Sequence, residues 1–140
     1  MKDQLEYSQE RPYSILVVDD EPGFRDMLKW HLDALGVEVA TAQDGEEAMK
    51  HAAKGNVLLV ITDLTMPRLN GLELLSKLKE RNPGMEVVIL TGFGSVETAV
   101  SAMKRGAADF ILKPFDLDSF LKVIKGILGK FKDERPGGAQ

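Results

Sequence analysis

VLLVIT, at residues 57–62, is the most apolar stretch of the chain, and Asp63 follows it directly. A strand that is apolar along nearly its whole length is typically buried on both faces, as in the centre of a parallel sheet. This stretch therefore predicts the central strand of a sheet that is covered on both sides. Other apolar runs that read as strands lie at residues 15–18, 37–42, 86–91 and 109–112.

An amphipathic stretch follows each of these runs and predicts a helix. The first has Pro22 in its first turn and Gly36 after its end, where these residues are favoured. The second begins with Asp44 three residues before a glutamate, which is a capping-box pattern, and should extend to about Lys54. Asn70, Ser95 and Asp116 precede the other three, and the last of these carries apolar residues as far as Phe131.

Strands that alternate with single helices require crossover connections, and these produce a mostly parallel sheet with helices on both faces. We therefore predict one α/β domain, a three-layer sandwich, over residues 13–131. Residues 1–12 and 132–140 are polar and are predicted to be tails. The C-terminal tail is either a free end or the stub of a linker.

The composition of the chain excludes several classes of functional site and of binding partner. The chain has 140 residues and no cysteine, which excludes disulfides, thiolate metal sites and cysteine nucleophiles and fits a reducing compartment. Its net charge of −4 does not favour direct binding to nucleic acid. No apolar run approaches the roughly 20 residues of a membrane span, and the N-terminus has no apolar core of a secretory signal. We therefore expect a cytoplasmic protein that binds neither membranes nor nucleic acid directly.

Polar residues gather where the predicted strands end. Asp19 and Asp20 follow the first strand, Asp63 follows the third, Thr91 ends the fourth, and Lys113 follows the fifth. Ligands of open α/β sheets bind beyond the carboxyl ends of the strands. A single aspartate, threonine or lysine in such a place is usually a turn residue or a solvated side chain. The joint placement of these residues favours one shared site.

The residue types in this set point to phosphate chemistry. Three carboxylates in one crevice repel one another, and either raised pKa values or a hard cation such as Mg²⁺ would offset that repulsion. A metal ion, the ammonium of Lys113 and the hydroxyl of Thr91 around one free carboxylate would suit phosphoryl transfer. The bond between Lys113 and Pro114 is a candidate for the cis form, which would help to hold the lysine.

Four segments resemble the receiver domain of two-component response regulators, the CheY-like phosphoacceptor family. They are ILVVDDEP at 15–22, VLLVITDLTMPRLNGLELL at 57–75, VVILTGFG at 87–94 and GAADFILKPF at 106–115. The resemblance covers about residues 13–131. It implies a flavodoxin-like (βα)5 fold with strand order 2-1-3-4-5. The C-terminal half is most similar to receivers of nitrogen-regulator-type transcription activators.

The resemblance also implies roles for the acidic residues. Asp63 would be the phosphoacceptor. Asp20 and Asp63 would ligate Mg²⁺ directly, Asp19 would act mostly through water, and the backbone carbonyl of Thr65 would be the third protein ligand. The same site would also accept Mn²⁺.

The resemblance also implies which residues bind the phosphoryl group and which change conformation when it is bound. Thr91 and Lys113 would bind the phosphoryl oxygens, and Phe110 would be the aromatic switch residue that turns inward with Thr91. Thr65 and Phe93 occupy the positions that flank the path of an attacking water in the family. Neither carries an amide or carboxylate that could orient a water, so we expect slower loss of the phosphoryl group than in receivers with polar residues at both positions. The alternative is that Phe93 points away from the site, into solvent or a partner surface.

The resemblance implies a cognate sensor histidine kinase as a partner. The chain is then either a stand-alone regulator or a receiver fused to an output domain beyond residue 140. A homodimer through the fourth helix, the fifth strand and the fifth helix is also implied. The first predicted helix carries Trp30, which is either a contact for the kinase or an ordinary packing residue. The chain would be a signalling phosphoacceptor with its own phosphorylation and dephosphorylation chemistry rather than an enzyme.

Other classes of protein fit the sequence less well. A haloacid-dehalogenase-type phosphatase needs a second aspartate two residues after the first, where this chain has Thr65. A flavodoxin needs a Ser/Thr/Gly-rich phosphate loop after the first strand, where Asp19, Asp20 and Glu21 would repel a phosphate. No G-x-G-x-x-G dinucleotide motif follows that strand. An interaction module without chemistry would leave the whole polar set unexplained.

Overall fold

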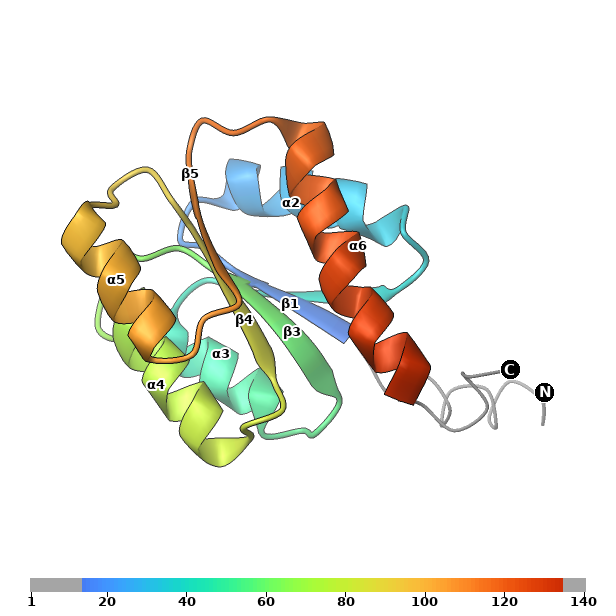
Figure 1. Ribbon diagram of the computed structural model, residues 1–140, viewed down its shortest axis with the longest axis horizontal. Helices are drawn as coiled ribbons and strands as arrows, with labels where there is room; N and C mark the ends of the chain where they lie inside the picture. The colour runs from blue at the N-terminus through green and yellow to red at the C-terminus, as the bar shows by residue number, and fades with distance from the viewer. Residues whose placement is uncertain (1–13, 135–140) are drawn as a thin grey trace.

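The computed structural model describes residues 14–134, in which five strands alternate with five helices (Figure 1). The predicted tail at residues 1–12 lies outside this range, as do residues 135–140 of the other tail. The strands are β1 (Ser14–Val18), β2 (Glu38–Ala42), β3 (Val57–Thr62), β4 (Glu86–Thr91) and β5 (Asp109–Leu112). The helices are α2 (Pro22–Asp33), α3 (Gly45–Ala52), α4 (Gly71–Arg81), α5 (Val96–Lys104) and α6 (Leu117–Glu134).

The sheet has the order β2-β1-β3-β4-β5, and every neighbouring pair is parallel. This confirms the predicted fold class and strand order. β1 lies between β2 and β3, with Val18 paired to both Ala42 and Thr62. The carboxyl ends of these three strands therefore meet at one edge of the sheet.

Helices cover both faces of the sheet, which makes the domain a three-layer sandwich. Ile15 and Val17 belong to a buried cluster with residues of α2 and α6, while Leu16 and Val18 belong to a second cluster with residues of α3, α4 and α5. Figure 1 shows the same division, with α2 beside α6 and the other three helices across the sheet. Both faces of β3 are buried in this way, which explains its nearly continuous apolarity.

Side-chain caps fix the starts of several helices. The Asp44 carboxylate accepts a hydrogen bond from the Glu47 amide at 2.8 Å, and Asn70 forms a reciprocal capping box with Glu73. The predicted ends differ by a few residues. α3 stops at Ala52 rather than Lys54, and Gly55 then turns the chain with a φ of 92°. α6 continues past Phe131 to Glu134.

The apolar residues of α5 are an exception to the usual pattern. Ala102 is buried, but Val96, Val100 and Met103 are 80%, 45% and 50% exposed. Periodicity reveals an apolar face of a helix without showing whether the protein's own core or another surface covers it. Within residues 14–134, no helix is both long and apolar enough to cross a lipid bilayer.

Candidate functional site

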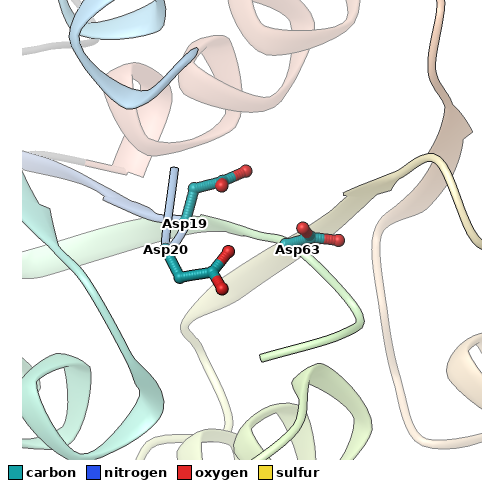
Figure 2. Close-up of side chains that lie close together, drawn as sticks. All are labelled: Asp19, Asp20 and Asp63. Carbon is teal, nitrogen blue, oxygen red and sulfur yellow. The ribbon is translucent and has the colours of Figure 1, made fainter. Parts of the chain in front are cut away.

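Three carboxylates lie together at the carboxyl edge of the sheet. Asp19 and Asp20 follow β1, and Asp63 follows the adjacent β3. One oxygen from each carboxylate lies within 4.8 Å of the others. Asp19 and Asp63 are buried and Asp20 is exposed. Figure 2 shows Asp19 and Asp20 leaving the same strand end in different directions, with Asp63 beside them.

Backbone hydrogen bonds fix the positions of the two buried aspartates, Asp19 and Asp63, relative to the neighbouring strands. The amide of Asp19 donates to the carbonyl of Ala42 at 3.1 Å, and the amide of Asp63 donates to the carbonyl of Val18 at 3.0 Å. Nearby amides also bind one oxygen of each carboxylate. Glu21 donates to Oδ1 of Asp19 at 2.9 Å, and Leu64 donates to Oδ1 of Asp63 at 2.6 Å. These bonds restrict both carboxylates to one orientation.

Lys113 reaches the other oxygens from the end of β5. Its Nζ lies 3.2 Å from Oδ2 of Asp19 and 3.8 Å from Oδ2 of Asp63. Its backbone amide donates to the carbonyl of Thr91 at 2.8 Å, which ties the residue to β4. The Lys113–Pro114 peptide bond is cis. The two distances from Nζ place the Lys113 ammonium close to both buried carboxylates, Asp19 and Asp63.

The electrostatics of the site favour an added cation. Burial raises the pKa of the Asp19 carboxyl, while the Glu21 amide and Lys113 oppose that change. An acid with a raised pKa in the folded state binds its proton more readily there than in the unfolded chain. Its contribution to stability is therefore lost as pH rises through the raised pKa, and ionised Asp19 lowers the free energy of unfolding at neutral pH. Oxygen ligands, crowded negative charge and an exposed third carboxylate fit Mg²⁺.

Thr91 and Phe110 occupy the neighbouring β4 and β5. Thr91 is fully buried, and its hydroxyl accepts a hydrogen bond from the Phe93 amide at 3.1 Å. Within the part of the chain that the structure describes, no hydrogen bond joins this hydroxyl to the acidic residues. Phe110 is half-buried and packs on the loop at Gly94, where an added Cβ would lie 2.7 Å from its ring. Phe93 itself is 74% exposed.

The structure adds residues that the sequence analysis did not assign to the site. Arg25 donates from Nη1 to the backbone carbonyl of Asp19 at 2.8 Å. The ring of Phe24 lies under the Lys113 ammonium, 3.9 Å from Nζ to the ring centroid. Both are in the first turns of α2, so their nearness to Asp19 and Asp20 in sequence was the available signal.

Fold and site together define a doubly wound parallel α/β domain with three clustered carboxylates and a lysine at the carboxyl edge of its sheet. The family model described as the response regulator receiver domain matches residues 15–125. The chain belongs to this family, the receiver domains of two-component signalling, as its sequence segments predicted.

Known relatives agree with this assignment. The chain is 37% identical to the transcriptional regulatory protein GlrR of Escherichia coli over 84% of its own length and 27% of that protein. It is 39% identical to the nitrogen assimilation regulatory protein NtrX of Azorhizobium caulinodans, over 83% of this chain and 26% of the relative. It thus spans about a quarter of the length of these curated relatives.

Solved structures show the same fold. The receiver domain of NtrX from Brucella abortus is 42% identical, with a TM-score of 0.77 over 82% of this chain and 98% of that one. A receiver domain from Clostridium thermocellum is 34% identical, with a TM-score of 0.80 over 86% and 97% of the two chains.

Proposed function

We propose that Asp63 accepts a phosphoryl group from a cognate sensor histidine kinase in a Mg²⁺-dependent reaction, and that the modified domain controls an output domain or partner. The observation that carries this proposal is the grouping of Asp19, Asp20 and Asp63 around the Lys113 ammonium. We also retain the cytoplasmic location expected from the sequence. Incubation with acetyl phosphate and Mg²⁺ should add one phosphoryl group to the intact mass, and no addition would refute the proposal.

The chemistry is an in-line displacement at phosphorus. A carboxylate oxygen of Asp63 forms a bond to phosphorus as the bond from phosphorus to the donor histidine nitrogen breaks, and the nitrogen keeps the electron pair. Lys113 neutralises charge on the phosphoryl oxygens from its place beside Oδ2 of Asp63. Later attack by water on phosphorus releases inorganic phosphate and restores the carboxylate.

A bound Mg²⁺ would supply further positive charge at the phosphoryl group. Asp20 and Asp63 would hold it directly, with the backbone carbonyl of Thr65, and Asp19 would act mostly through water. Mn²⁺ has similar ligand preferences and is expected to substitute.

Mg²⁺ should stabilise the fold, because it offsets repulsion among the three carboxylates and binds only the folded chain. A thermal-shift titration of the parent chain should show a rising melting temperature. Asp20→Ala should remove most of this response, and Asp19→Ala should remove less of it. Lack of any Mg²⁺ response in the parent chain would contradict the metal site.

Phosphorylation is proposed to act through Thr91 and Phe110. The Thr91 hydroxyl would exchange its bond with the Phe93 amide for a phosphoryl oxygen, and Phe110 would turn into the space that Thr91 leaves. The close packing of Phe110 on Gly94 supports a coupling between the loop after β4 and the aromatic ring.

We predict that the double variant Thr65→Asn/Phe93→Glu loses its phosphoryl group faster than the parent. The added amide and carboxylate would orient a water for attack, which the native side chains do not do. The exposure of Phe93 leaves room for this replacement. The decay of the phosphorylated mass with time provides the measurement, and an unchanged or slower decay would contradict the prediction.

The output is proposed to involve a second copy of the chain, which would form a homodimer through α5, β5 and α6. The exposed apolar residues Val96, Val100, Met103 and Leu112 lie on α5 and β5 and support this choice. A beryllofluoride-activated NtrC4 receiver domain dimer has a TM-score of 0.79 and 36% identity with this chain. The relative GlrR is named as a transcriptional regulatory protein, and we propose an output domain of that type beyond residue 140.

A further inference from the structure

Phe24 is in contact with the lysine of the acidic site. The Lys113 ammonium lies 3.9 Å from the centroid of the Phe24 ring. The same nitrogen is 3.2 Å from Oδ2 of Asp19 and 3.8 Å from Oδ2 of Asp63. The ammonium is thus held by two carboxylates and one aromatic face, and these come from three different segments of the chain.

The Phe24 ring also packs against other aromatic side chains. Phe24 meets Phe115 edge to face, with centroids 6.2 Å apart and planes at 87°. Phe115 in turn lies 5.2 Å from Phe120, which is 1% exposed and belongs to the core. The neighbouring Arg25 ties the same turn of α2 to the backbone of Asp19. The ring therefore has a defined place relative to the acidic residues.

A lysine side chain is long and flexible, so its ammonium needs contacts on several sides to keep one position. The nearer carboxylate, Asp19, draws Nζ away from Asp63. The negative face of an aromatic ring attracts a cation without forming a competing ion pair. The Phe24 face thus limits the paths by which the ammonium can leave the space beside Asp63.

We propose that Phe24 is a positioning residue for phosphoryl transfer, because its ring face holds the Lys113 ammonium where it can neutralise the phosphoryl group. This inference rests on the proposed function of Asp63. A positioning role for Phe24 differs from a simple packing role in the property of the ring on which it depends. A packing role depends on the size and shape of the ring, whereas attraction of the ammonium depends on the negative charge of the ring face.

Graded fluorination separates these two roles. Phenylalanines with one, two and three ring fluorines at position 24 keep nearly the same shape while they weaken the negative face. The rate of phosphorylation by acetyl phosphate at saturating Mg²⁺ should fall stepwise, by about threefold to tenfold over the series. The same series at Phe120, which is buried and touches no cation in the described structure, should leave the rate unchanged and serves as the matched control.

Three further measurements support the test. Phe24→Leu should slow phosphorylation as much as the trifluorinated ring or more, while Phe24→Trp should retain most of the rate. Mg²⁺ affinity should stay the same in all variants. In the unphosphorylated parent, the ring should shift the Lys113 ε-methylene proton resonances upfield, and Phe24→Leu should abolish that shift.

Each outcome has a clear meaning. A flat fluorination series in chains that still gain the phosphoryl group would overturn the inference and leave the proposed function intact. Full activity of Phe24→Leu, or an unshifted ε-methylene signal in the parent, would also overturn it. A parent chain that gains no phosphoryl group would overturn the proposed function, and the inference with it.

Discussion

Asp63→Asn should abolish phosphoryl uptake from acetyl phosphate. An asparagine oxygen can still accept the hydrogen bond that Leu64 now donates to Oδ1, so the loop should keep its shape. The amide is a far weaker nucleophile than the carboxylate, and it removes one of the two negative charges next to Lys113. The change should therefore affect the chemistry much more than the fold.

A matched substitution elsewhere controls for the general effect of losing a carboxylate. Asp116→Asn removes an exposed carboxylate that accepts hydrogen bonds from Ser119 at the start of α6, where asparagine also caps helices well. That variant should gain the phosphoryl mass at the parent rate. Equal gain of an acid-labile phosphoryl group by Asp63→Asn would mean that the acceptor has been misassigned.

Gly71→Ala should strongly destabilise the domain. Gly71 is the first residue of α4, and its amide donates to the carbonyl of Leu64 at 2.8 Å. An added Cβ would lie 2.9 Å from Cα of Leu64 and would clash with the carbonyl oxygen of Asp63. Both neighbours are backbone atoms, so either α4 or the loop after β3 must move. The free energy of unfolding should fall by roughly 1–3 kcal/mol, and the melting temperature by roughly 5–10 °C.

Another glycine offers the matched control for this prediction. Gly126 lies within α6, and an added Cβ there would meet no atom within 4 Å. Gly126→Ala should therefore raise the free energy of unfolding by about 1 kcal/mol, because alanine favours a helix more than glycine does. Denaturant unfolding of both variants checks the pair. Equal stability of Gly71→Ala and the parent would show that α4 does not pack against the acceptor loop as described.

The sequence predicted the fold because its strands and helices alternate strictly and its most apolar strand is central. The sequence also predicted that the acidic residues lie together at the carboxyl edge of the sheet, for a related reason. In a parallel sheet, residues that follow neighbouring strands must lie near one another, so Asp19, Asp20 and Asp63 could be placed together without knowledge of any side-chain position.

Contacts between distant segments could not be predicted in this way. Lys113 and Asp19 are 94 residues apart, and the position of the ammonium over Phe24 depends on the packing of α2 against the end of β5. The exposure of Val96 and Val100 on α5 could not be predicted either, since their spacing is that of any amphipathic helix. Arg68 adopts a φ of 69° and pairs with Asp44 at 3.1 Å, and nothing in its local sequence signals either feature.

Location of the phosphoryl bond tests the central proposal most directly. Borohydride reduces an acyl phosphate to a primary alcohol, and this converts a phosphorylated aspartate into homoserine. The chain should be treated with acetyl phosphate and Mg²⁺, reduced, digested and sequenced by mass spectrometry. Homoserine at position 63 is the expected result, with unmodified aspartate at positions 19 and 20. Homoserine at any other position, or none in a chain that has gained the phosphoryl mass, would contradict the assignment of Asp63 as the acceptor.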